Sequence, residues 1–331
     1  MNERFVTILK PGLQTTVQEL PGRIGFWEQG FPPSGPVDAW SFRLANLLVG
    51  NDRDTAALEC QFLGPTLKFG DDGFIAVAGA DMRPTLDGMD VAMWRTIAVS
   101  AGQTLELGAA RTGARSYIAF SGGIDTPPVL GSRAVFHMAN IGGAALKAGE
   151  SLPLGAKADF LEPMTVLEDA RPIISSDKVR TVECMLGPND DWLHPDSITE
   201  FLTAEWIVQA KSSRTGIRLT GPEFRFAERA INKPSDHGQD PSNILDHGYP
   251  LGAVNLAGQT PIILINDSPS TGGFINPFTV ISGAFWKLGQ ARPNERLKFR
   301  AVSMDEAQQI RRDIDSRSYR SSLCLIREHG A

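Results

Sequence analysis

The sequence has little cysteine, no block of basic residues and no long apolar run. Its three cysteines, Cys60, Cys184 and Cys324, lie far apart and form no CxxC pair. The spacing therefore predicts neither a disulfide framework nor a cysteine-based zinc site. The formal net charge is −6, which argues against a nucleic-acid partner, because such a partner requires clustered Lys and Arg.

The same scarcities bear on location. No stretch approaches the roughly 20 apolar residues that span a bilayer, so we expect no membrane segment. The N-terminal residues, MNERFVTILKPG, lack the apolar core of a signal peptide. Scarce, unpaired cysteine suits a reducing compartment. We therefore expect a cytoplasmic protein.

The chain has 331 residues, of which 42% are hydrophobic and 21% charged. That length predicts two globular units with packed cores. A stretch of mixed composition near 153–178 separates them, so we place an N-terminal unit at 1–155 and a C-terminal unit at 175–331. The 33 glycines and 22 prolines punctuate many short strand-like runs. This pattern predicts a mainly β chain whose sheets close into barrels or sandwiches.

Few helices are expected. Asp38 is placed to cap a helix over 39–49, and a second helix is expected near 196–202. A third begins at Ser303, where the run Ser303-Met304-Asp305-Glu306 has the form of a capping box.

The first candidate site segment spans 12–38, and it is rich in Gly, Pro, Thr and Gln. Its prolines and glycines predict a rigid loop that presents polar side chains. Arg23 could clamp a carboxylate or carbamate, and backbone N–H groups near Ser34 could stabilise an oxyanion. The alternative is a structural turn before a helix. The candidate residues here are Thr15, Thr16, Gln18, Arg23 and Ser34.

The second candidate segment, 236–249, holds two His and three Asp. It has no HxH or HxxxH spacing, so we expect no metal site. Hydrogen bonding of a polar substrate by Ser242 and Asn243 is favoured, in what we expect to be a loop. The alternative is a solvated connection.

The third candidate segment, 266–274, follows an apolar strand-like run at 262–265. Asp267, at the strand end, could serve as a base. Ser270, Thr271, Gly272 and Gly273 could supply donors to an anionic group. The segment lacks a GxxxxGK[ST] loop, so independent ATP binding is not expected. The alternative is an ordinary hairpin turn.

The candidate segments also carry a family resemblance. The opening run is GLQTTVQELPGRIGFWEQGFPPSGPVDAWSFRLANLLVGN, and later runs include SGGIDTPPVLGSR and DPSNILDHGYPLGAVNLAGQTPIIL. Across nearly the whole chain these resemble the allophanate hydrolase subunit 2 family. That family includes the carboxyltransferase region of urea carboxylase and urea amidolyase, the C subunit of 5-oxoprolinase, and KipA. The runs PSN at 241–243 and WKLGQ at 286–290 are similar to the urea carboxylase branch.

The resemblance implies two cyclophilin-like β-barrel units and an enzyme that works as one subunit of a complex. It implies a partner like allophanate hydrolase subunit 1 (KipI-like). In the urea carboxylase reading, a carboxyl group moves from carboxybiotin to an amide nitrogen. Biotin carboxylase and biotin carrier protein are then further partners. The chain has no Met-Lys-Met segment for biotin attachment, so biotin would be held on a separate carrier, and ATP would act only through partner subunits.

Two other readings stay open. One is the C subunit of an ATP-dependent 5-oxoprolinase, a lactam hydrolase with a LamB/YcsF-like partner. The other is a KipA-like regulatory binding protein. Within the resemblance, Glu19, Val37 and the stretch 232–239 depart from the family pattern, which leaves the substrate open. The catalytic roles of Arg23, Ser34 and Asp267 are predictions from residue chemistry.

Overall fold

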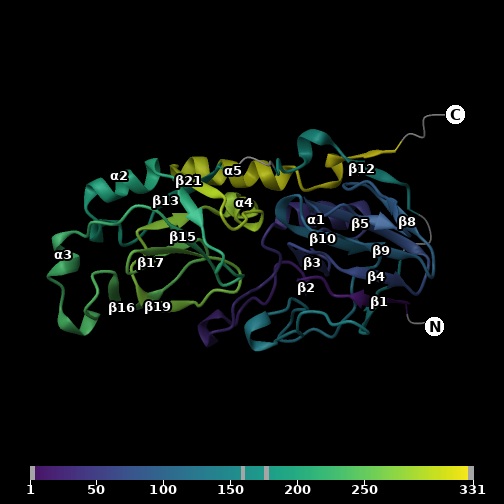
Figure 1. The fold of residues 1–331 in the computed structure, drawn as a ribbon, viewed down its shortest axis with the longest axis horizontal. Helices are drawn as coiled ribbons and strands as arrows, with labels where there is room; N and C mark the ends of the chain where they lie inside the picture. Colours follow the sequence, from purple (N-terminus) through teal and green to yellow (C-terminus); the bar gives the residue numbers. More distant parts are fainter. Residues whose placement is uncertain (1–3, 158–160, 175–178, 327–331) are drawn as a thin grey trace. The chain divides into compact units, whose positions relative to one another are not determined.

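The computed structural model describes residues 4–157, 161–174 and 179–326. The chain forms two compact units. Unit 1 comprises residues 1–24, 34–176 and 313–331, and unit 2 comprises 25–33 and 177–312. Most elements in both units are strands, as Figure 1 shows. The prediction of a mainly β chain with few helices is confirmed.

Unit 1 is built on two antiparallel sheets. The six-stranded sheet has the order β11 (Ser151–Leu154), β1 (Arg4–Lys10), β4 (Thr66–Phe69), β9 (Thr104–Glu106), β6 (Thr85–Leu86), β7 (Met89–Asp90). The five-stranded sheet has the order β2 (Gln14–Gln18), β3 (Ala57–Gln61), β10 (Thr112–Phe120), β5 (Gly73–Asp81), β8 (Ile97–Val99). A short ribbon pairs β12 (Met164–Val166) with β22 (Leu323–Leu325).

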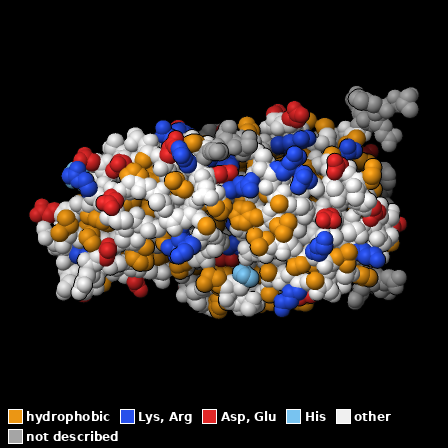
Figure 2. All heavy atoms as spheres, viewed as in Figure 1, with side chains coloured by type: hydrophobic (Ala, Val, Ile, Leu, Met, Phe, Trp, Pro, Cys, Tyr) orange, Lys and Arg blue, Asp and Glu red, His pale blue; other side chains and the backbone are white. Residues whose placement is uncertain are grey.

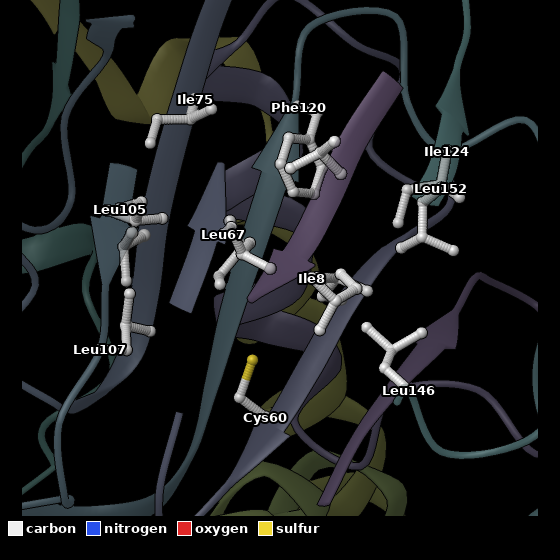
Figure 3. Close-up of a cluster of buried hydrophobic side chains, with 14 of the residues drawn as sticks. Ile8, Cys60, Leu67, Ile75, Leu105, Leu107, Phe120, Ile124, Leu146 and Leu152 are labelled. Atoms are coloured by element: carbon white, nitrogen blue, oxygen red, sulfur yellow. The ribbon is translucent and has the colours of Figure 1, made fainter. Parts of the chain in front are cut away.

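The core of unit 1 draws side chains from both sheets. Ile8 and Leu67 from the six-stranded sheet lie in one buried cluster with Cys60, Ile75 and Phe120 from the five-stranded sheet (Figure 3). Alternation along each strand sends these apolar residues to one face, and burying them together is the main stabilising contribution. The helix α1 (Ala39–Leu48) packs against β5 and β10.

Unit 2 contains a closed barrel. Its strand order is β13 (Val179–Leu186), β20 (Phe278–Val280), β17 (Ala253–Ala257), β18 (Thr260–Leu264), β15 (Gly216–Thr220), β14 (Trp206–Val208), β21 (Arg296–Ala301). The closing pair β13–β21 is parallel, and the other pairs are antiparallel. A separate ribbon pairs β16 (Asn243–Gly248) with β19 (Thr271–Phe274).

The barrel core is aromatic. Phe201, on α2 (Pro195–Thr203), is fully buried. Its ring stacks on Phe278 at 4.0 Å and on Phe299 at 4.3 Å between ring centroids, so the helix inserts one large apolar side chain among the strands. The remaining helices are α3 (Glu228–Ile231), α4 (Phe285–Gly289) and α5 (Met304–Ser316). Short 3-10 turns are η1 (Trp27–Gln29), η2 (His137–Ala139), η3 (Glu168–Ala170), η4 (Asp190–Trp192), η5 (Ser235–His237), η6 (Ser282–Ala284) and η7 (Arg320–Ser322).

The helix starts expected from the sequence are present. Asp38 accepts a hydrogen bond from the backbone N–H of Ser41 at 3.0 Å, which caps α1. Ser303 and Glu306 bond each other's backbone N–H groups at the start of α5. This is the reciprocal capping box that the sequence predicts.

Two stretches group differently from the boundaries expected at 1–155 and 175–331. Residues 25–33 lie with unit 2, and residues 313–331 lie with unit 1. For the second stretch the reason is visible: Asp315 pairs with Arg43 at 2.9 Å, and the Arg53 guanidinium lies 4.3 Å from the centre of the Tyr319 ring. Contacts between residues so far apart in the sequence could not be predicted from it.

Two surface observations complete the fold. In the part of the chain that the structure describes, no helix is both long and apolar enough to cross a membrane. Figure 2 shows basic and acidic side chains interspersed on the visible face.

Candidate functional site

The buried strand β2 carries three of the predicted binding residues. Thr15, Thr16 and Gln18 are at most 2% exposed. The Gln18 side-chain amide donates to Thr16 Oγ1 at 2.9 Å and to the Val135 carbonyl at 3.1 Å, while its oxygen accepts from the Gly35 N–H at 2.9 Å. The amide of Gln18 therefore ties three separate parts of unit 1 together.

The Gly35 bond fixes an unusual turn. Ser34 has φ of 57° and Gly35 has φ of 84°, so both lie in the left-handed region, which costs energy at the serine unless neighbouring contacts hold it. Ser34 is buried. The predicted loop over 12–38 that presents polar side chains is wrong for Thr15, Thr16 and Gln18, which lie buried on strand β2. The predicted oxyanion-binding role of Ser34 stays a prediction.

Two buried side chains that the sequence analysis missed hold the rest of this turn. Glu59 accepts hydrogen bonds from the Val37 N–H and from the Tyr117 hydroxyl, both at 2.9 Å. The Tyr117 oxygen in turn accepts from the Asp38 N–H at 2.9 Å. Burial, followed by the nearby Glu59 and Asp38 charges, raises the pKa of Tyr117 well above its usual value, so the phenol stays a neutral donor. The sequence feature that could have indicated Glu59 is its position as a charged residue inside the strand-like run of β3.

Arg23 is also buried, at 1% exposed. Its Nε donates to the Val129 carbonyl at 3.2 Å, and its Nη2 donates to the Ala134 carbonyl at 2.8 Å. The guanidinium thereby fastens the loop at 129–134 to the first candidate segment. Its predicted role as a clamp for a substrate carboxylate stays a prediction.

Asp267 in unit 2 forms a buried two-point ion pair. Its carboxylate accepts from Arg214 Nε at 2.9 Å and from Arg214 Nη2 at 3.1 Å, and both side chains are at most 4% exposed. Paired geometry of this kind fixes two chain segments together. A proton-accepting role for Asp267 stays a prediction.

The second and third candidate segments pair with each other. Asn243 lies opposite Phe274, and Gly248 lies opposite Thr271, in the ribbon β16–β19 (Figure 1). The sequence-based loop over 236–249 is therefore wrong for 243–248, and residues 271–274 are strand. Asn, Asp, His and Gly disfavour strands on intrinsic preference, and pairing with a distant partner overrides that preference.

Ser242, just before β16, is completely buried. Its hydroxyl donates to the Asp240 carboxylate at 2.7 Å and accepts from the Gly258 N–H at 2.9 Å. Hydrogen bonds from the Ser242 hydroxyl and N–H lower the pKa of Asp240. Asn243 is partly buried, and its backbone carbonyl oxygen accepts from Lys233 Nζ at 2.7 Å. Both residues brace the start of the ribbon, and their contact with substrate stays a prediction.

Both glycines of β19 are packed against neighbours. A Cβ at Gly272 would lie 2.7 Å from the Tyr249 ring, and a Cβ at Gly273 would lie 2.9 Å from the Ile244 carbonyl oxygen. The Tyr249 oxygen accepts from the Phe274 N–H at 2.6 Å. Gly272 therefore lets the aromatic ring lie directly on the strand, and Gly273 allows the close approach of the Ile244 backbone.

Residues of this ribbon, of the turn η1 and of the segments beside them line an open pocket of about 500 Å³ within unit 2. Its lining comes from three segments of the chain: Trp27, Glu28 and Gly30; Gly248, Tyr249 and Pro250; Ser270 and Thr271. The structure thus brings the predicted residues Ser270 and Thr271 together with part of the first candidate segment. Sequence reasoning missed Trp27, Glu28 and Tyr249.

The pocket offers groups that can bind a small molecule. It combines aromatic and proline walls with two hydroxyls and one carboxylate, a mixture typical of ligand sites. Burial raises the pKa of Tyr249, and hydrogen bonds from the Phe274 N–H and the Asn255 side chain oppose that shift. The phenol ring is therefore a fixed, neutral wall. Within the described residues, no group of three or more His, Cys, Asp and Glu is arranged to hold a metal ion.

Comparison with known proteins places the chain in a family. Residues 29–301 match the model for the carboxyltransferase domain, subdomain A and B. Urea amidolyase of Saccharomyces cerevisiae is 37% identical over 94% of this chain. The chain spans only 17% of that relative's length. The crystal structure of K. lactis urea amidolyase superposes with a TM-score of 0.91 at 36% identity, and covers 96% of this chain and 20% of that one.

A second group of relatives matches in length as well. The C subunit of 5-oxoprolinase from Escherichia coli K12 is 34% identical over 93% of this chain and 95% of the relative. The resemblance seen in the sequence motifs is confirmed. The chain therefore belongs to the carboxyltransferase domain family, subdomains A and B, and lies nearer to urea carboxylase and urea amidolyase than to the C subunit of 5-oxoprolinase.

Proposed function

We propose that this chain is the carboxyltransferase component of a biotin-dependent carboxylase that moves a carboxyl group onto the nitrogen of urea or a related amide. The observation that carries the proposal is the match of residues 29–301 to the carboxyltransferase domain, with near-complete structural overlap on K. lactis urea amidolyase. Because the chain spans a fifth or less of the urea amidolyases it matches, the steps that charge biotin would lie outside these 331 residues.

The lining of the pocket fits the chemistry of both reactants. Biotin and urea each carry a planar ureido group, with N–H groups beside a carbonyl. The rings of Trp27 and Tyr249 offer flat apolar surfaces for such a group. The hydroxyls of Ser270 and Thr271 would donate to its carbonyl oxygen, and the Glu28 carboxylate would accept from its N–H. When bound, carboxybiotin supplies an activated carboxyl group.

The chain's own residues would then act by binding and orienting. A substrate nitrogen must lose a proton when it gains a carboxyl group, and a carboxylate within hydrogen-bond reach of that N–H can accept it. Glu28 is the carboxylate that lines the pocket. The residues predicted from sequence, Arg23, Gln18 and Asp267, hold loops and strand ends in place through buried bonds. We therefore propose them as positioning residues.

The experiment is co-purification of the tagged chain from its native host, followed by an assay of the recovered complex. Mass spectrometry should find a protein like allophanate hydrolase subunit 1, a biotin carboxylase and a biotinylated carrier. The complex should transfer label from ¹³C-bicarbonate to a urea-type substrate in the presence of ATP. Robust turnover by the purified chain alone would overturn the multi-component reading.

A second function has one specific observation in its favour. The E. coli 5-oxoprolinase relative matches this chain over 95% of its own length, whereas the urea amidolyases are several times longer. In that case the chain would act with a LamB/YcsF-like partner in ATP-dependent opening of a lactam. Recovery of that partner without biotin, and hydrolysis of 5-oxoproline, would replace the carboxylase proposal.

A further inference from the structure

The charge pattern of the pocket is one-sided. Among its eight lining residues, Glu28 is the one that carries a charge at neutral pH, and none is Lys, Arg or His. A ligand carboxylate would meet a like charge there and find no counter-ion among these side chains. The two proposed substrate classes differ in this respect: urea-type compounds are uncharged, whereas 5-oxoproline is an anion at neutral pH.

The polar groups of the pocket can bind a ligand that carries an amide N–H next to a carbonyl oxygen. Glu28 can only accept hydrogen bonds when ionised, while Ser270 and Thr271 can donate. These lie beside the rings of Trp27 and Tyr249. A ligand that presents an N–H next to a carbonyl oxygen on a flat framework matches both the polar groups and the walls.

Trp27 adds an independent observation. Its indole Nε1–H is buried and has no hydrogen-bond partner within the described part of the chain. A buried donor without an acceptor costs free energy, so it calls for a partner.

From these three observations we propose that the pocket selects uncharged ureido or amide ligands and excludes carboxylates, with Glu28 as the residue that sets this selectivity. The inference deepens the proposed function and rests on it for the assignment of the pocket to substrate chemistry. The recognised chemistry is shared by two sources: a small urea-type acceptor and the ureido ring of biotin.

The test measures binding directly, with the full chain and without turnover. Tryptophan is labelled with ¹⁵N, and the indole signal of Trp27 is identified by its absence in Trp27→Phe. The ligands form a matched pair, 2-pyrrolidinone and 5-oxoproline, which share a lactam and differ by the carboxylate. N-Methylurea then tests binding of a urea-type acceptor, and biotinamide tests binding of the ureido ring of biotin.

We expect 2-pyrrolidinone to bind at least about tenfold more tightly than 5-oxoproline, since a like charge at short range disfavours the anion. Glu28→Gln should reduce that ratio to about threefold or less. Gln29→Ala, at the neighbouring exposed position outside the lining, should leave it unchanged. A shift with N-methylurea alone assigns the pocket to the acceptor, and a shift with biotinamide alone assigns it to the cofactor ring.

A blocking variant keeps the test independent of folding. Gly248 lines the pocket, and a Cβ there would meet no atom within 4 Å, so Gly248→Val adds bulk to the pocket wall at a position with room for its Cβ and places a β-branched residue in β16. It should weaken every ligand that binds by at least about tenfold while the melting temperature holds. Equal affinity for 2-pyrrolidinone and 5-oxoproline in the wild-type chain, or no Trp27 shift with any ligand, would overturn the inference. Carboxylation of urea by the complex without such a shift would remove this inference alone and leave the proposed function standing.

Discussion

The phenolic oxygen of Tyr249 accepts a hydrogen bond from the backbone N–H of Phe274 at 2.6 Å. This bond joins the end of β16 to the end of β19, and it holds the aromatic wall of the pocket in one orientation. His247 adds a second link, because its Nε2 lies 3.0 Å from the Phe274 carbonyl oxygen. The ribbon is therefore fixed by side chains as well as by its own ladder.

Removing the Tyr249 hydroxyl should loosen this ribbon. Tyr249→Phe keeps the ring but leaves the Phe274 N–H without its acceptor, so the free energy of unfolding should fall by about 1 kcal/mol. Differential scanning calorimetry measures the change. Tyr319→Phe is the matched control, because Tyr319 is 48% exposed and its ring would still lie under Arg53. An equal loss in both variants would contradict the proposed importance of the Tyr249–Phe274 bond.

The side-chain amide of Gln18 allows a test of what stabilises the turn at Ser34 and Gly35. Gln18→Glu keeps an oxygen for the Gly35 N–H but removes the donor to Thr16 and the Val135 carbonyl. It also buries a charge at a site that is 0% exposed. We expect a loss of about 2–4 kcal/mol in the free energy of unfolding, from an unpaired buried charge and an orphaned carbonyl.

Gln308→Glu supplies the comparison for that variant. Gln308 is an exposed residue of α5, so the same chemical change there should shift stability by less than about 0.5 kcal/mol. If the two variants melted at the same temperature, Gln18 would not be holding the turn.

The ion pair of Arg214 and Asp267 separates a structural role from a catalytic one. Asp267→Asn leaves a buried guanidinium without its countercharge, which costs about 3–5 kcal/mol in pairs of this kind. A proton acceptor would instead lose turnover with little change in stability. Measuring the melting temperature and the turnover of the reconstituted complex together distinguishes the two. Glu205→Gln is the control, since it breaks an exposed pair with Arg296 and should cost less than about 1 kcal/mol.

Alkaline pH should destabilise unit 2 in part through the thiol of Cys184. Burial, and then the charge of Glu183, raises the pKa of Cys184 from 9.0 to about 12. Below pH 9 the thiol is neutral in both states and its contribution to stability is complete. Above pH 9 the unfolded thiol ionises first, so stability falls until about pH 12, by up to about 1.4 kcal/mol per pH unit.

Cys184→Ala should remove that part of the slope of unfolding free energy against pH between 9 and 12. Cys324→Ala, at a partly exposed position, is the reference. The remaining slope has other sources, because burial also raises the pKa of Tyr249 in unit 2 and of Cys60 and Tyr117 in unit 1. An unchanged slope in Cys184→Ala would show that this thiol ionises normally in the folded chain.

The sequence predicted the features that depend on neighbours in the chain. Asp38 and Ser303 each lie within three residues of the groups that they cap, so their patterns are visible locally. The mainly β character likewise follows from short apolar runs between turn residues. The match to the carboxyltransferase family rested on motifs rather than on physical patterns.

Contacts between segments that are distant in the sequence could not be predicted from local patterns. Glu59 accepts hydrogen bonds from Val37, 22 residues away in the sequence, and from Tyr117, 58 residues away. The residues next to Glu59 in the sequence do not indicate either partner. Trp27 joins unit 2 although it stands between two stretches of unit 1. The pocket is lined by three segments that are separated in the sequence. The sequence around each lining residue therefore did not indicate that it lines a pocket.

The close fit of Gly272 against Tyr249 leads to the last prediction. A methyl group at this position would lie 2.7 Å from the ring, closer than carbon atoms pack without strain. In Gly272→Ala either the ring or the strand must move, and overpacking of this kind costs about 1–3 kcal/mol. Gly248→Ala, opposite the neighbouring residue Thr271 in the same ribbon, meets open space and should leave stability within about 0.5 kcal/mol. The two variants therefore differ in packing while sharing a substitution. Thermal unfolding of both, with the ring signals of Tyr249 followed by NMR, measures the effect. A displaced Tyr249 ring should also weaken binding in the pocket, and unchanged ring signals in Gly272→Ala would mean that the ribbon yields instead of the wall.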